Sequence, residues 1–154
     1  MRRVRYNRVS GGRMTRVALL SMAASVLMIG QDVKRLASHD GNCQISVPSS
    51  WETSTIGGVG GSPDRKMSVA VGSPQRVSSF DVLKQNAKKL YTKDKVTKDS
   101  SSEFEMEGQS MNGKPNVYRG ITIPGGKYCT VEVMYESGTA ADARKIAGSL
   151  KSGK

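Results

Sequence analysis

The stretch EFEMEGQSMNGKPNVYRGITIPGGKYCTVEVMYE, residues 103–136, decides the class of the fold. Apolar and polar residues alternate through it in three runs, the pattern of half-buried strands. The runs cover 103–107, 115–123 and 127–136. Asn112-Gly113 favours a two-residue hairpin turn after the first run, and Pro124-Gly125-Gly126 separates the other two. Hairpins leave no room for a parallel crossover, so this half is predicted to be an antiparallel meander.

Three shorter strands and two helices are predicted around the meander. The strands cover 43–48, 51–56 and 67–72, and the helices cover 79–91 and 140–151. The glycine-rich segment 57–66 is expected to be a mobile hairpin loop, because it lacks the pattern of a phosphate-binding loop. The chain is therefore predicted to be one α+β domain, an antiparallel sheet flanked by two main helices.

Residue spacing predicts the buried face and the first residues of each helix. Phe80, Leu83, Ala87 and Leu90 fall on one face of the first helix. Ser78 with Asp81 resembles a capping box there, and Thr139 can cap the second helix. The buried stripe of the second helix is expected to comprise Ala143, Ile146, Ala147 and Leu150.

The net charge of +11 belongs mostly to the first quarter of the chain. Residues 1–39 hold 8 of the 24 Lys+Arg and 1 of the 13 Asp+Glu, so the remainder carries +4. That is an ordinary surface balance, and we expect no nucleic acid among the partners.

Residues 1–30 resemble an export signal or an N-terminal membrane anchor. Six arginines precede the apolar block Val17 to Gly30, which is shorter than the ~20 residues that span a bilayer comfortably. Cleavage would give a periplasmic or extracellular protein, whereas an uncleaved segment would hold it at the inner membrane. An organellar transit peptide is the competing interpretation, and the continuous apolar block argues against it. Residues 31–41 are predicted to be a linker, and 42–152 the folded domain.

The two cysteines lie in the apolar rows of their strands. Cys43 precedes Ile45 and Val47 in one row, and Cys129 precedes Val131 in another. In an oxidising compartment they could form a disulfide between the two strands. Two buried free thiols are the alternative, because the sequence does not say whether the strands are adjacent.

Lysines gather on the outer side of the first helix and after it. A partner-binding or lipid-binding surface is predicted for Lys84, Lys88, Lys89 and Lys95. The alternative is that these lysines only solvate the helix.

Arg119 is unexpected, because it shares the alternate row of Val117 and Ile121. Either Gly120 marks a bulge that re-aims the row, or Arg119 is a buried or ligand-facing cation. We favour the bulge or a strand-end position. Glu103, Glu105 and Glu107 share one strand face, where a solvated acidic surface that pairs with lysines explains them better than a metal site.

Several segments together resemble the PsbP and DcrB-like superfamily of small α+β domains. The resemblance rests on ISVPSSW, on MSVAVGSP followed by FDVLKQNAKKL, on NVYRGITI with KYCTVEVMYE, and on the final IAGSLK. It spans about Cys43 to Lys151 and implies an antiparallel sheet flanked by helices. Members of the superfamily are mostly binding proteins: lumenal photosystem subunits, bacterial envelope proteins, chaperones for secreted toxins and a branch that binds a small GTPase.

The sequence thus predicts a non-catalytic extracytoplasmic accessory domain, protein-binding or chaperone-like, with a protein partner in the cell envelope and no cofactor. Its single histidine, His39, falls in the predicted linker, which gives a catalytic triad nothing to fix it. The first alternative is a small-molecule-binding or hydrolytic enzyme that uses Arg119, Tyr118 and strand carboxylates. The second is binding to an anionic membrane surface through the lysine-rich helix.

Overall fold

Two antiparallel sheets and two helices form the part of the chain that the structure, a computed structural model, describes: residues 32–153. The predicted leader, 1–30, lies outside these residues. The helices are α1 (Phe80–Leu90) and α2 (Ala140–Gly148). The strands are β1 (Val33–Ala37), β2 (Cys43–Pro48), β3 (Glu52–Thr53), β4 (Val59–Gly61), β5 (Met67–Gly72), β6 (Thr92–Asp99), β7 (Glu103–Gln109), β8 (Pro115–Ile123), β9 (Lys127–Tyr135) and β10 (Lys151–Ser152). The predicted α+β class is confirmed.

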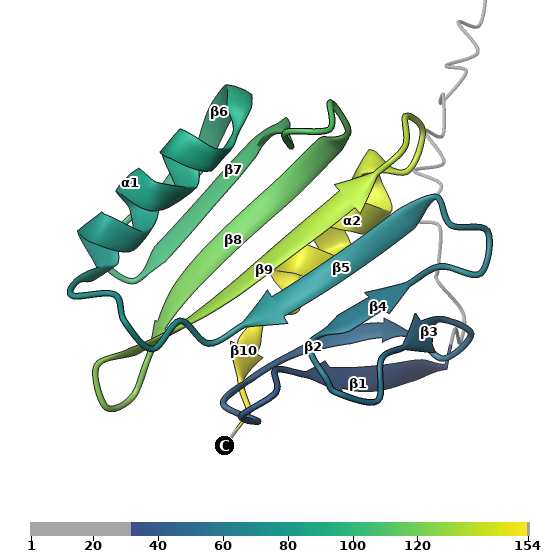
Figure 1. The fold of residues 1–154 in the computed structure, drawn as a ribbon, viewed down its shortest axis with the longest axis horizontal. Coiled ribbons are helices and arrows are strands. Elements are labelled where there is room, and N and C mark those ends of the chain that lie inside the picture. Colours follow the sequence, from purple (N-terminus) through teal and green to yellow (C-terminus); the bar gives the residue numbers. More distant parts are fainter. Residues whose placement is uncertain (1–31, 154) are drawn as a thin grey trace, which may run out of the picture.

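The large sheet has the strand order β3-β4-β5-β9-β8-β7-β6, and the small sheet has the order β1-β2-β10. The predicted meander is the run β7-β8-β9, whose registers are continuous (Figure 1). β5 pairs with β9, so the first half of the chain joins the meander through its last strand.

The small sheet and α2 share one hydrophobic core with one face of the large sheet. Ile45 and Val47 of β2 pack there with Val131 and Val133 of β9, and all four are fully buried. The helix adds Ala143, Ile146 and Ala147, and Leu150 just beyond it is also buried. The predicted stripe is therefore confirmed, although the helix ends before its last member.

Helix α1 packs on the opposite face of the large sheet, over the end near β6 and β7. Phe80, Leu83 and Ala87 contact a second core that includes Phe104 and Met106 of β7. Leu90 was predicted to join this face but is 56% exposed. The β4, β5 and β9 end of the same face is left uncovered (Figure 1).

Several segments fold differently from the prediction. The predicted linker contains β1, which pairs with β2 along its whole length. The predicted mobile loop contains β4, which pairs with β3 and β5. The lysine-rich segment after the first helix is the edge strand β6. All of its residues are exposed, so buried and exposed positions do not alternate along it.

Glycine explains why β4 was missed. A Cβ at Gly60 would lie 3.1 Å from the Glu52 carbonyl oxygen and 3.3 Å from Leu36 Cδ2. Gly60 therefore lets β4 approach Glu52 of β3 and Leu36 of β1 closely, and a three-residue strand with two glycines carries no apolar alternation.

The helix caps also differ from the prediction. Ser79, not Ser78, is the N-cap of α1, and its hydroxyl accepts a hydrogen bond from the Val82 amide at 3.2 Å. The Thr139 side chain does not cap α2; its hydroxyl donates to the Glu136 carbonyl instead. No helix within 32–153 is long and apolar enough to cross a membrane.

Candidate functional site

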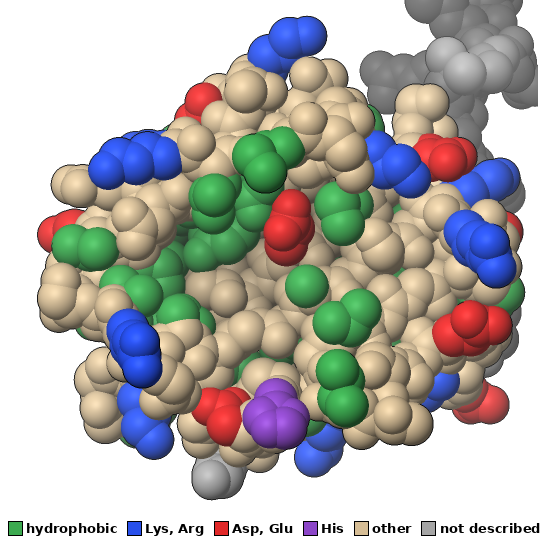
Figure 2. All heavy atoms as spheres, in the orientation of Figure 1, with side chains coloured by type: hydrophobic (Ala, Val, Ile, Leu, Met, Phe, Trp, Pro, Cys, Tyr) green, Lys and Arg blue, Asp and Glu red, His purple; other side chains and the backbone are tan. Residues whose placement is uncertain are grey.

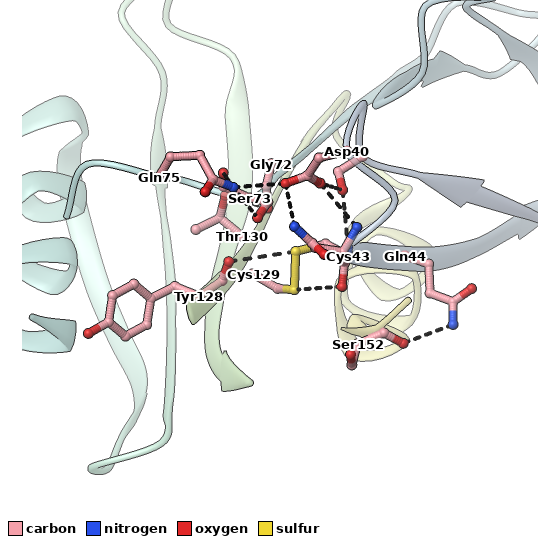
Figure 3. The surroundings of a disulfide bond; sticks show 12 residues. Asp40, Cys43, Gln44, Gly72, Ser73, Gln75, Tyr128, Cys129, Thr130 and Ser152 are labelled. Atoms are coloured by element: carbon pink, nitrogen blue, oxygen red, sulfur yellow. Dashed lines mark hydrogen bonds between the residues drawn. A yellow bond between two sulfur atoms is a disulfide. The ribbon is translucent and has the colours of Figure 1, made fainter. Parts of the chain in front are cut away.

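The predicted site residues do not come together in one place. Cys43 and Cys129 form a disulfide, which joins β2 of the small sheet to β9 of the large sheet (Figure 3). Both cysteines are fully buried, and their Cα atoms lie 5.4 Å apart. The pair is therefore a structural link between the two sheets and offers no exposed sulfur for chemistry.

Asp40 organises the turn beside this disulfide. Its carboxylate accepts hydrogen bonds from Ser38, Asn42 and Gln75, so it ties the β1–β2 turn to the segment after β5 (Figure 3). Desolvation alone would raise the pKa of Asp40, but the hydrogen bonds from Ser38 and Asn42 outweigh it and hold this pKa well below its usual range. The predicted linker thus includes a fixed turn.

Arg119 is an inward, paired cation. The strands on both sides of it keep a continuous register, so the bulge that we favoured is wrong. Its guanidinium pairs with Glu103 and, at 3.5 Å, with Glu105, and only 14% of its side chain is exposed. Tyr118 points to the opposite face, because successive strand residues alternate. Of the residues in the enzyme alternative, Arg119 and the carboxylates of Glu103 and Glu105 thus come together, whereas Tyr118 does not join them.

The acidic row of β7 is not the solvated, lysine-paired surface that was expected, because Glu105 is buried and the row pairs chiefly with arginines. Glu103 and Glu105 face Arg119, and Glu107 pairs with Arg144 of α2. In the described chain, no group of three or more His, Cys, Asp or Glu side chains is placed to hold a metal ion.

The predicted lysine surface is divided. Lys84 pairs with Asp99 at 2.6 Å, and Lys88 lies over the Phe104 ring. Lys89 is exposed on α1, whereas Lys95 lies opposite Glu107 in the β6–β7 pairing and so faces the α2 side of the sheet. Lys95 therefore does not share the α1 surface of the other three lysines.

The structure shows a different candidate, a groove between α1 and the uncovered sheet face. It consists of two adjoining hollows of about 360 and 370 Å³, both lined by Leu90, Tyr91 and Glu132. We call it the Glu132 groove. Hydrophobic side chains gather on this face around an acidic one (Figure 2).

Three members of one cross-strand row, Ala70, Glu132 and Tyr118, line the floor of the groove. Strand pairing aligns Val59, Ala70, Glu132, Tyr118 and Met106 on neighbouring strands. The methyl group of Ala70 and the absence of a side chain at Gly72 leave space above β5 beside α1. The groove therefore exists because small residues of β5 lie next to a helix that ends above them.

Glu132 is held by neutral groups. The Asn116 amide, which is 1% exposed, donates to Glu132 Oε1 at 3.2 Å. Burial raises the pKa of Tyr91, and Glu132 raises it further as a charge and as a hydrogen-bond acceptor. Burial and then the Glu132 charge likewise raise the pKa of Tyr118. Both tyrosines consequently remain protonated and can donate hydrogen bonds beside the carboxylate.

The rim of the groove is apolar and exposed. Leu90 ends α1, and Met111 at the β7–β8 turn is 92% exposed; both line the second hollow. Val59 extends the floor row outward and is also exposed. Large apolar side chains grouped on a surface are typical of binding sites.

Sequence reasoning missed Glu132 and the groove. Glu132 stands between Val131 and Val133, a position that alternation assigns to the solvent side of a strand. Glu132 becomes the centre of a half-enclosed site only because α1 and the β7–β8 turn pack beside it. No local sequence pattern predicts where these two segments pack.

No protein-family model matches this chain, and no curated protein matches it. A solved structure does: the solution structure of cyanobacterial PsbP (CyanoP) from Synechocystis sp. PCC 6803. The superposition has a TM-score of 0.49 and 11% identity, and covers 81% of this chain and 95% of that one. The match is a likeness of fold alone and carries nothing about activity or partners.

Proposed function

We propose that this chain is a non-catalytic extracytoplasmic accessory domain that holds a protein partner in the Glu132 groove. The observation that carries the proposal is the groove itself: an uncovered sheet face beside α1 with an apolar rim and one fixed carboxylate. Binding sites for ligands are commonly concave and mostly apolar, with a few placed polar groups.

The extracytoplasmic part of the proposal draws on the disulfide. A disulfide persists in oxidising compartments and is rare where thiols are kept reduced. The arginine-rich, apolar leader in the sequence points the same way.

Site-specific photo-crosslinking in the native host tests the proposal. A photoreactive residue at Leu90 or at Val59 should give a discrete adduct with one envelope protein, because both positions border the groove. The same residue at Lys151, exposed on β10 of the small sheet, is the matched control and should not give that adduct. A stable chain whose groove positions give no adduct, or the same adducts as Lys151, would contradict the proposal.

A further inference from the structure

We infer that the Glu132 groove recognises a basic side chain, carried by a partner segment with apolar residues on either side. The inference rests on the proposed function and gives the chemistry of the partner.

The first reason is an unbalanced charge. Among residues 32–153, no lysine or arginine forms an ion pair with Glu132. Its described partners, Asn116 and Tyr91, are neutral donors. A carboxylate accepts about four hydrogen bonds, so it retains capacity for a charged donor from outside. A basic group would supply both the missing charge and the missing donors.

The second reason is the aromatic wall. The rings of Tyr91 and Tyr118 lie 5.8 Å apart between centroids and both line the hollow that contains Glu132. Aromatic faces attract ammonium and guanidinium groups, and the apolar stem of a lysine or arginine packs on the same surface. A carboxylate between two tyrosines therefore suits a cation with an apolar stem better than it suits a purely apolar side chain.

The third reason is the extent of the apolar rim. The two hollows share Glu132; the exposed side chain of Met111 lines the second, and exposed Val59 pairs with Ala70, which lines the first. A free amine would fill the centre and leave these side chains in water. A chain segment brings the cation and covers the flanking apolar surface together, so a polypeptide is the occupant that fits.

The test compares peptides that differ at one position. Full-length protein is titrated, with NMR detection, with acetylated Leu-Thr-X-Thr-Leu peptides in which X is lysine, arginine, norleucine or glutamate. We expect the lysine and arginine peptides to bind at least about 10-fold more tightly than the norleucine peptide, the gain of one charge-assisted hydrogen bond. The glutamate peptide should bind most weakly.

Two variants locate the effect. Glu132→Gln keeps the size of the side chain and removes its charge, and should reduce the preference for lysine over norleucine to less than about 2-fold. Glu136→Gln, at an exposed carboxylate just beyond β9, is the matched control and should leave the preference unchanged. The comparison of peptides on the unaltered protein stands even if one variant fails to fold.

The outcomes separate the inference from the proposed function. Equal binding of lysine and norleucine peptides, with shifts confined to groove residues, would overturn the basic-side-chain inference and leave the groove a binding site. A lysine preference that survives Glu132→Gln would also overturn it. If no peptide binds and photo-crosslinking at Leu90 yields nothing, both fall.

Discussion

At the scale of the single residue, Arg119 carries a charge into the contact between β8 and α2. The α2 backbone lies close to it, since a Cβ at Gly148 would be 3.6 Å from Arg119 Nη1. Glu105, with 11% of its side chain exposed, faces this guanidinium, and the Arg119 Nε atom is buried without a partner among the described residues. The pair is thus held in a largely water-free environment where each charge depends on the other.

Removing Arg119 should therefore be costly. We expect Arg119→Ala to lower the free energy of unfolding by about 3 kcal/mol, because Glu105 is left buried and unpaired. Lys98→Ala is the matched control: Lys98 pairs with Glu103 at 3.1 Å but is half exposed, so its loss should cost at most about 1 kcal/mol. Urea unfolding followed by circular dichroism measures both. Equal losses in the two variants would mean that the Arg119 pair behaves as a surface pair.

The residue scale also shows how far sequence reasoning reaches. The apolar phase of Cys43 and Cys129 placed both sulfurs in the core, which made a disulfide one of two open interpretations. The phase of Arg119 in its strand was also predicted, but a bulge or a strand-end position was favoured over a buried cation, which needs partners. Those partners lie on a neighbouring strand, so only strand pairing could identify them.

At the scale of the element, α1 is the wall of the Glu132 groove, and its start depends on one side chain. Ser79 caps the helix through the Val82 amide, while the hydroxyl of Ser78 has no part in this cap. A serine N-cap satisfies an amide that has no partner inside the helix.

Ser79→Ala should accordingly lower the free energy of unfolding by about 1 kcal/mol. Ser78→Ala is a control of identical chemistry one residue earlier and should change the free energy by less than about 0.5 kcal/mol. Chemical denaturation of the two variants in parallel distinguishes these expectations. A larger loss of unfolding free energy in Ser78→Ala than in Ser79→Ala would show that Ser78, and not Ser79, caps the helix.

A second link at this scale joins α2 to β7 through Arg144 and Glu107. The two side chains form a forked pair, with Arg144 Nη2 at 3.1 Å from Glu107 Oε2. The hydrogen bond from Arg144 lowers the pKa of Glu107, and partial burial offsets this effect in part. The folded state therefore prefers ionised Glu107, which adds stability above the unfolded-state pKa of about 4.3.

This contribution should disappear in acid. We expect the stability advantage of the wild-type chain over Glu107→Gln to be fully present above about pH 5 and to shrink as the pH falls through the lowered pKa of Glu107. Denaturation curves at several pH values between about 3 and 6 measure the difference. Glu136→Gln, at an exposed carboxylate without an ion pair within residues 32–153, is the matched control for the loss of one acidic group. A wild-type advantage that grows in acid would reverse the assigned direction of the pKa shift.

An element could be predicted from the sequence only where its apolar residues recur with the period of a helix or a strand. Strands β5 and β9 and both helices were predictable because each buries one periodic row, and β2 and β8 because their apolar residues alternate in the sequence. Strand β6 buries nothing, β4 is mostly glycine, and β1 and β10 complete a second sheet far from each other in sequence. The pairing of these strands is a tertiary property, so the sequence near each one gave no sign of it.

At the scale of the whole molecule, the chain is a large sheet with a small one closed against it. The small sheet combines β1 and β2 from the start of the described chain with β10 from its end (Figure 1). Its contact with the large sheet is the shared core and the disulfide from β2 to β9. The uncovered face with the Glu132 groove lies on the other side of the large sheet, so a partner can bind there without disturbing this closure.

The disulfide should make a large contribution to that closure. It joins residues 86 positions apart, and a closed loop of this size restricts the unfolded chain strongly. Replacing both cysteines, Cys43→Ala with Cys129→Ala, should lower the free energy of unfolding by about 2 to 5 kcal/mol. Urea unfolding with and without reductant provides the control: reductant should move the wild-type midpoint most of the way to that of the double variant and leave the variant unchanged. A double variant whose free energy of unfolding is within about 0.5 kcal/mol of the wild type would show that the core alone holds the two sheets together. Alkylation of both cysteines in unfolded, unreduced wild-type protein would show that the disulfide does not form.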